Sequence, residues 1–143
     1  MIVVRDTPIG NVGLTTCFDV RFPEQFLALN EAGAQVILVP SAFMPTTGKN
    51  HWHALLRARA IENQLYIAAA AQYGQHNSAR SSYGHSLIVG PFGEVLSDLG
   101  PSQDGIATVD IDFGLIDAVR KQIDLPKSRA RVREVMPKGV SVL

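Results

Sequence analysis

The stretch that decides the fold is residues 11–39, NVGLTTCFDVRFPEQFLALNEAGAQVILV. Residues 11–16 (NVGLTT) are typical of a short strand, and residues 36–39 (VILV) form a continuous apolar run that suits a strand buried on both faces. Between them, Pro23 fits the first turn of a helix and Gly33 supplies its end. Strand, helix and strand in this order predict a βαβ unit whose two strands run parallel in one sheet.

The rest of the chain continues this alternation. Residues 40–50 are expected to form a loop, residues 51–63 place apolar side chains on one stripe of a helix, and residues 65–71 (LYIAAAA) are typical of another buried strand. The remaining expectations are a polar loop, a hairpin, a strand and a last helix, at residues 75–82, 86–98, 106–111 and 114–123. Because there is no internal repeat or linker, we expect residues 1–143 to form one α/β unit.

Composition and charge exclude several classes of protein. Hydrophobic residues make up 46% of the 143 residues and charged residues 18%, which rules out disordered, collagen-like and low-complexity chains. The 13 basic residues cancel the 13 acidic ones, so net charge directs the chain neither to nucleic acid nor to an anionic membrane. A basic cluster near the end is more typical of a solvated segment than of a polyanion site: Lys127, Arg129, Arg131 and Arg133.

Sequence signals for cellular location and for metal binding are both missing from the residue pattern. No apolar stretch reaches the ~18 residues of a membrane span, and no signal-peptide core follows the start, so we expect a soluble, cytoplasmic chain, with a mitochondrial location left open. Cys17 is the single cysteine, which excludes an internal disulfide. His51 and His53 lie two residues apart and His76 and His85 are isolated, so no spacing matches a zinc site and no metal is expected.

Cys17 is the first candidate for chemistry. It stands at the carboxyl end of the first expected strand and before the expected helix, where α/β folds hold ligands. A helix start favours a thiolate by about 0.3–1 kcal/mol. A buried, unreactive cysteine is the competing interpretation, and acyl transfer also needs a general base and oxyanion donors.

Two further side chains are expected at the same end of the sheet. Arg21, four residues after the cysteine, either holds a substrate carboxylate through two parallel hydrogen bonds or pairs with Asp19 or Glu24. Thr47, in the loop after the next strand, either binds a ligand or caps a turn. Three charged residues of the expected helix favour a structural ion-pair face: Arg57, Arg59 and Glu62.

The segments around these residues resemble the nitrilase (carbon–nitrogen hydrolase) superfamily. The nucleophile segment is CFDVRFPE at residues 17–24, preceded by TPIGNVGL at residues 7–14. Later blocks follow in the family's order: PSAF at residues 40–43, HW at 51–52, RARAIEN at 57–63, GHS at 84–86 and GPFG at 90–93. The resemblance spans about residues 6–125 and is strongest to the Nit branch, with its deaminated glutathione amidases and the related ω-amidases.

The resemblance implies the second half of an α-β-β-α sandwich and a thiol-dependent amidase that assembles into a homo-oligomer. Cys17 would be the nucleophile that attacks an amide carbonyl; ammonia or an amine would leave, and water would cleave the thioester. The backbone N–H of Phe18 would be an oxyanion donor, and Arg21 and Thr47 would contact the carboxylate of a small substrate. Neither a metal nor an organic cofactor is implied.

The resemblance also implies a catalytic glutamate, a catalytic lysine and a further glutamate upstream of the nucleophile. The sixteen residues before Cys17 contain no glutamate and no lysine. Since loss of a general base costs about 10²–10⁴ in rate, little or no amidase activity is expected of this chain alone. Three interpretations remain open: part of an active amidase, a non-catalytic half-domain that binds or assembles with a partner, and an unrelated α/β protein with a redox-sensing thiol.

Overall fold

A computed structural model describes residues 2–136 of the chain as eight strands, one 3₁₀ helix and four α-helices. The strands are β1 (Ile2–Thr7), β2 (Gly10–Leu14), β3 (Val36–Leu38), β4 (Tyr66–Ala69), β5 (Tyr73–Asn77), β6 (Arg80–Tyr83), β7 (Leu87–Val89) and β8 (Val95–Asp98). The helices are the 3₁₀ helix η1 (Cys17–Arg21), α1 (Pro23–Glu31), α2 (Pro45–Asn63), α3 (Phe113–Gln122) and α4 (Leu125–Val135).

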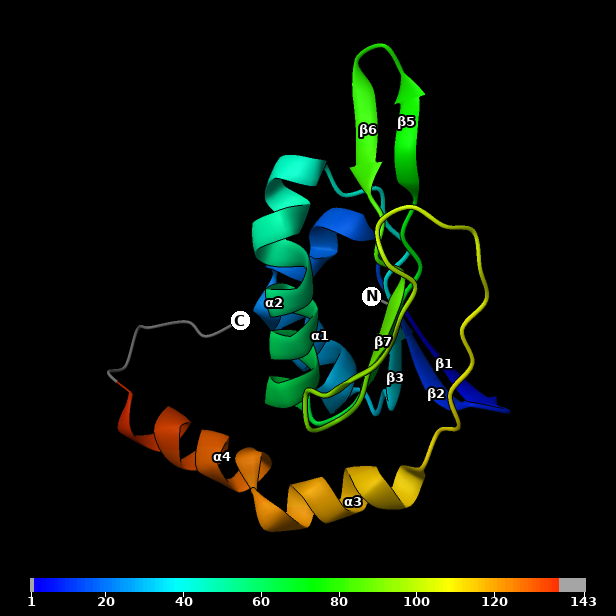
Figure 1. Cartoon of the computed structure of the whole chain (residues 1–143). Helices are drawn as coiled ribbons and strands as arrows, with labels where there is room; N and C mark the ends of the chain where they lie inside the picture. The colour runs from blue at the N-terminus through cyan, green and yellow to red at the C-terminus, as the bar shows by residue number, and fades with distance from the viewer. Residues whose placement is uncertain (1, 137–143) are drawn as a thin grey trace.

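A six-stranded sheet in the order β1-β2-β3-β4-β7-β8 forms the centre, and β5 and β6 extend from it as a separate hairpin (Figure 1). The βαβ prediction is confirmed, because β2 pairs parallel with β3, and β3 pairs parallel with β4. Gly13 lies opposite Ile37, and Ile37 lies opposite Ile67, so these strands end at a common edge. The outer strands β1, β7 and β8 pair antiparallel with their neighbours, and β7 and β8 form the hairpin expected at residues 86–98.

Helices α1 and α2 cover one face of the sheet (Figure 1). The main core lies beneath them and includes Phe26, Trp52 and Leu56, whose side chains are fully buried. Burying such a side chain contributes about 1.5–3 kcal/mol, so this layer supplies most of the hydrophobic stabilisation. The continuous apolar runs of β3 and β4 provide the sheet side of this core through Ile37 and Ile67.

The opposite face of the sheet carries an apolar row that is only partly covered. Strand register aligns Leu14, Leu38, Ala68 and Ile88 across four strands, and all four side chains keep some exposure. Helix α3 packs against one end of this face through Ile116. Residues 99–107 pass over the remainder and leave a cavity of about 660 Å³ lined mainly by apolar side chains. This half-covered region, defined by the apolar row and the cavity, is called the open face below.

Three expected elements are wrong. Residues 40–50 are not a loop throughout, because α2 begins at Pro45, whose fixed φ suits a first helical turn. Residues 75–82 belong to the β5–β6 hairpin, whose polar side chains are mostly exposed and therefore lack the alternation of a half-buried strand. Residues 106–111 alternate as a strand should but pair with no strand of the described residues, and Ile106 is 91% exposed.

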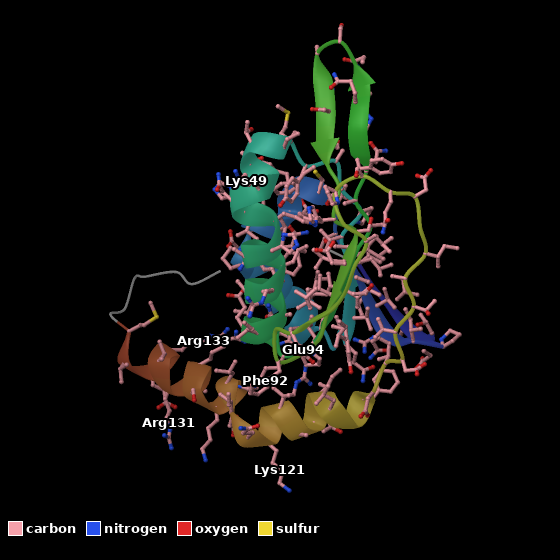
Figure 2. All side chains as sticks on the ribbon, viewed as in Figure 1. Lys49, Phe92, Glu94, Lys121, Arg131 and Arg133 are labelled. Atoms are coloured by element: carbon pink, nitrogen blue, oxygen red, sulfur yellow. The ribbon has the colours of Figure 1, made fainter. Side chains whose placement is uncertain are left out.

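Neither β1 nor α4 is predicted from the sequence pattern. The basic cluster lies on α4, where Arg129 donates to the Glu62 carbonyl oxygen and Arg133 pairs with Glu31 at 2.8 Å. Arg131 instead points away from the body of the chain, as does Lys121 on α3 (Figure 2). The cluster is therefore partly a docking contact and partly solvated. Within residues 2–136, no helix has both the length and the apolar character needed to cross a membrane.

The contact between α2 and β6 depends on the absence of a side chain at Gly48. A Cβ at this position would lie 2.4 Å from Cγ of Tyr83. We predict that Gly48→Ala lowers the free energy of unfolding, because overpacking costs about 1–3 kcal/mol and exceeds the gain of about 1 kcal/mol from helix propensity. Urea denaturation measures the change. In a Tyr83→Ala background the same substitution should be neutral or stabilising, and an equal loss in both backgrounds would contradict the steric explanation.

Candidate active site

Cys17 occupies a strained turn at the carboxyl edge of the parallel strands. Its φ is 46°, in the left-handed region that residues other than glycine seldom adopt. Its N–H donates to the carbonyl oxygen of Pro40 at 2.9 Å, just beyond β3. Thr15, two residues earlier, donates to the Leu38 carbonyl oxygen from both its N–H (3.1 Å) and its Oγ1 (2.8 Å). These bonds fix a sharp turn that leaves the thiol half-buried.

The 3₁₀ helix η1 is held from both ends. At its start, the Asp19 carboxylate accepts a hydrogen bond of 2.8 Å from the N–H of Thr16. Near its end, Nε of Arg59 donates to the Val20 carbonyl oxygen at 2.8 Å. Arg59 is only 5% exposed and pairs with Glu62 at 2.5 Å, which confirms the predicted ion-pair face for these two residues, whereas Arg57 bonds the Gly93 carbonyl oxygen. Arg59 is therefore a positioning residue for the segment that carries the cysteine.

A short 3₁₀ helix that was not predicted lies between the cysteine turn and the helix that starts, as expected, at Pro23. Cys17 begins the five-residue η1, and α1 starts only at Pro23. The thiol therefore faces the start of a short 3₁₀ helix rather than that of a long α-helix. Phe18 is the second residue of η1, so its N–H belongs to the donors that lack an intrahelical acceptor at a helix start. Its side chain is 62% exposed.

Arg21 lies at the end of η1 between two aromatic rings. The carbon of its guanidinium is 5.4 Å from the ring centroid of Phe18 and 5.1 Å from that of Phe43. Its Nη1 is 3.3 Å from Nδ1 of His51. Among residues 2–136, none of the observed ion pairs includes Arg21, so the alternative of a structural pair with a nearby carboxylate is wrong. The guanidinium keeps donors for an anionic group.

Thr47 lies in the first turn of α2 rather than in a loop, because α2 begins earlier than expected. Its Oγ1 donates to the Met44 carbonyl oxygen at 3.3 Å, as expected of a threonine that caps a turn. It stands one helical turn before His51, the residue that contacts Arg21. The structure thus places Cys17, Phe18 and Arg21 on one short helix and Thr47 on the adjacent end of α2.

The sequence did not reveal the residues that hold η1 and Arg21 in place at the carboxyl edge of the sheet. His51, Phe43 and the bond from Arg59 to Val20 all position η1 or its arginine. The only sequence signals for His51 and Arg59 are the HW pair at residues 51–52 and the RAR run at residues 57–59. Neither motif indicates which atoms these side chains contact. The 660 Å³ cavity touches the site through Thr15, Thr16 and Pro40, and its lining does not include Cys17.

Cys17 is half-buried in a strained turn at the carboxyl edge of parallel strands, and Arg21 of the same 3₁₀ helix makes no ion pair within residues 2–136. These features define a candidate thiol site on an α/β sheet. The sequence profile described as Carbon-nitrogen hydrolase matches residues 1–121. The chain belongs to the carbon–nitrogen hydrolase family, and its resemblance to the nitrilase superfamily is confirmed.

Curated and solved relatives support this assignment. Deaminated glutathione amidase of Dictyostelium discoideum is 56% identical over 122 residues, which make up 85% of this chain and 42% of that protein. The Homo sapiens protein of the same name is 46% identical over 123 residues, or 86% of this chain and 37% of the relative.

Two crystal structures show the same fold. That of Caenorhabditis elegans NitFhit matches with a TM-score of 0.79 and 45% identity, over 92% of this chain and 31% of that one. Saccharomyces cerevisiae Nit3, a member of branch 10 of the nitrilase superfamily, matches with a TM-score of 0.80 and 33% identity, over 90% and 46% of the two chains. The α/β nitrilase-type fold is thereby confirmed. The chain spans less than half the length of each of these four relatives.

The anchoring role of Arg59 can be measured. Arg59→Met removes the donor to the Val20 carbonyl and the partner of Glu62 while keeping most of the side-chain volume. We expect a loss of about 1–3 kcal/mol in the free energy of unfolding, the cost of an unsatisfied buried polar group. Arg57→Met is the matched control, because Arg57 is exposed and makes one bond, to the Gly93 carbonyl at 2.7 Å. Equal losses for the two variants in urea denaturation would contradict the anchoring role.

Proposed function

We propose that this chain carries the nucleophile half of a thiol-dependent amidase, which hydrolyses the carbon–nitrogen bond of a small amide bearing a carboxylate. The observation that carries the proposal is Cys17, held in the left-handed backbone region at the start of η1 with its N–H bonded to Pro40. Such strain persists only where surrounding structure imposes it, and it clusters at functional sites. The names of the relatives from Dictyostelium discoideum and Homo sapiens point to deaminated glutathione as the substrate type.

The reaction forms and breaks one thioester. The Cys17 thiolate adds to the amide carbonyl carbon, and the backbone N–H of Phe18 donates to the oxyanion that develops. The C–N bond then breaks and the nitrogen leaves as ammonia, or an amine, after taking up a proton. Water attacks the thioester, which restores the thiol and releases a carboxylic acid. The proton transfers require the glutamate and lysine that the family resemblance assigns to sequence upstream of Cys17.

Arg21 and Thr47 are the proposed contacts for the substrate carboxylate. The guanidinium sits over the rings of Phe18 and Phe43 without a carboxylate partner within the described residues, which leaves its fork of donors available. Arginine binds a carboxylate through two parallel hydrogen bonds, a geometry that lysine lacks. The Thr47 hydroxyl donates its proton to the Met44 carbonyl oxygen. Toward the substrate it would therefore accept a hydrogen bond, or rotate and donate one.

A second candidate function rests on the open face. Its apolar row (Leu14, Leu38, Ala68 and Ile88) is the surface that a further layer of a sandwich would cover. Exposed apolar faces of this kind mark interaction surfaces. In this second function the chain is one pair of α and β layers, which an upstream half or a second copy in a homo-oligomer completes. A chain that only assembles, without catalysis, would have the open face but no functional use for Cys17.

Complementation distinguishes these two functions. Alone, the chain should release ammonia from a carboxylate-bearing ω-amide at a rate at least about 10²-fold below that of the complemented protein, because the family resemblance assigns the general base to sequence upstream of Cys17. Co-expression with the upstream half of the Dictyostelium discoideum deaminated glutathione amidase should restore turnover. The Cys17→Ser variant, expressed with the same half, is the control. Complex formation without ammonia release above this control would favour the assembly function.

Substrate charge tests Arg21. In the complemented protein, Arg21→Ala should lower kcat/KM for a carboxylate-bearing amide about 10- to 100-fold more than for a neutral amide of the same length, since a charge-assisted hydrogen bond contributes about 1.5–3 kcal/mol. Lys49→Ala removes a nearby exposed cation on α2 and serves as the control for long-range charge (Figure 2). Equal losses for both amides would assign Arg21 a structural role.

A further inference from the structure

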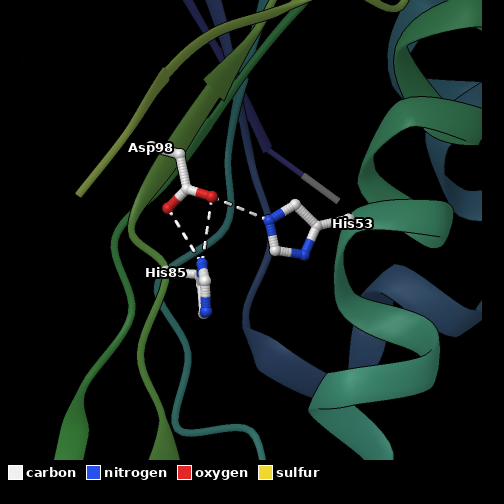
Figure 3. A group of neighbouring side chains, drawn as sticks. All are labelled: His53, His85 and Asp98. Atoms are coloured by element: carbon white, nitrogen blue, oxygen red, sulfur yellow. Dashed lines mark hydrogen bonds and ion pairs between the residues drawn. The ribbon is translucent and has the colours of Figure 1, made fainter. Parts of the chain in front are cut away.

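A second cluster of reactive side chains lies outside the cysteine site. His53 on α2, His85 just after β6 and Asp98 at the end of β8 bring two imidazoles and a carboxylate together (Figure 3). Nε2 of His53 lies 2.8 Å from Oδ2 of Asp98, and Nδ1 of His85 lies 3.0 Å from both carboxylate oxygens. The expectation that His85 is isolated is therefore wrong, because the fold joins residues that are 45 and 13 positions apart.

We propose that His53, His85 and Asp98 form a binding site for a divalent first-row transition metal of the Zn²⁺ type. The ligand atoms would be Nε2 of His53, Nδ1 of His85 and one carboxylate oxygen of Asp98. Imidazole nitrogen favours zinc, copper, iron or nickel over magnesium and calcium, which prefer oxygen ligands. Three protein ligands leave a further coordination position for water, as in zinc sites with three protein ligands.

The distances suit one ion. Zinc binds nitrogen and oxygen at about 2.0–2.2 Å, so two ligand atoms on one tetrahedral ion lie roughly 3.3 Å apart. The three ligand atoms already lie within 4.8 Å of one another, and each imidazole nitrogen is at 2.8–3.0 Å from the carboxylate. Small side-chain rotations are sufficient to bring them around an ion. The side chains are 33%, 18% and 27% exposed for His53, His85 and Asp98, so water and ions can reach them.

Two of the three proposed ligands, His85 and Asp98, are held by further contacts. His85 adopts a left-handed backbone, with φ of 59°; its N–H donates to Gly100 at 2.7 Å and its carbonyl accepts from the Trp52 indole at 2.8 Å. Its ring stacks on Tyr83, with centroids 4.5 Å apart. Oδ1 of Asp98 accepts from the Gly100 N–H at 2.8 Å, which orients the carboxylate. Such supporting contacts are what fix the ligands of a metal site before the ion arrives.

An ion at this position would also connect separate elements of the fold, because its three ligands come from different segments of the chain. An ion bound here would tie α2 to the β7–β8 hairpin and to the segment that enters β7. Because an unfolded chain does not bring the three ligands together, the ion would stabilise the folded state.

Imidazole NMR tests the proposal on the full chain without any substitution. The sequence contains four histidines, so each ring can be assigned. After treatment with chelator, addition of Zn²⁺ should shift Nε2 of His53 and Nδ1 of His85, and leave the rings of His51 and His76 unchanged. Calorimetry should give one Zn²⁺ per chain, and Zn²⁺ but not Mg²⁺ should raise Tm. Unchanged rings of His53 and His85, or shifts centred on His51 or His76, would overturn the proposal.

Substitutions provide the second arm. Asp98→Asn and His85→Ala should each weaken Zn²⁺ binding by at least about 10- to 100-fold, the loss typical of removing even a supporting group from a metal site. His76→Ala is the matched control, since His76 bonds Ser82 on the β5–β6 hairpin and lies outside the cluster. Circular dichroism checks that each variant is folded. Full Zn²⁺ affinity in folded Asp98→Asn and His85→Ala variants would show that the cluster is only a hydrogen-bonded structural contact.

Discussion

The parallel pairing of β2, β3 and β4 is the constraint on which the rest of the structure depends. It continues beyond the strands through hydrogen bonds from Ser41 N–H to the Ala70 carbonyl at 2.8 Å and from Cys17 N–H to the Pro40 carbonyl at 2.9 Å. Parallel crossovers are right-handed in about 98% of cases, and the order β2-β3-β4 advances in one direction. Both connecting helices therefore lie on one face. The same pairing brings the cysteine turn to the common carboxyl edge and leaves the other face without crossover helices.

The position of the cysteine turn and the uncovered sheet face both follow from this pairing. The covered face supplies the core and the buried Arg59 that bonds η1, so these contacts of the cysteine segment form within the chain itself. The open face has apolar side chains in register across four strands, and covering that face is what a sandwich of two sheets achieves. The chain thus holds a formed cysteine turn, the segment proposed to carry the nucleophile, together with an apolar face that is only partly covered. The resemblance to the nitrilase superfamily implies that the groups that move protons lie upstream of Cys17 in the sequence.

Sequence patterns predict the parts that depend on local or periodic signals. The apolar runs around Ile37 and Ile67 predicted buried strands, and the proline and glycine of the first crossover predicted α1. The β5–β6 hairpin was not predicted because its exposed residues show no alternation of apolar and polar side chains. A strand was wrongly predicted at residues 106–111, because this alternating segment has no strand to pair with among the described residues. The motif around Cys17 indicated the candidate site, and the roles of its residues stay a prediction. The anchor from Arg59 and the cluster of His53, His85 and Asp98 arise only from the tertiary fold.

Mass spectrometry of the reacting protein tests the central claim most directly, namely that Cys17 is the nucleophile of an amidase completed by an upstream half. The complemented protein is mixed with a carboxylate-bearing amide, quenched in acid and digested. The account predicts a transient acyl adduct, with the mass of a thioester, on the peptide that contains Cys17, and none when Cys17 is replaced by serine. Turnover without an adduct on that peptide, or persisting undiminished in the serine variant, would contradict it.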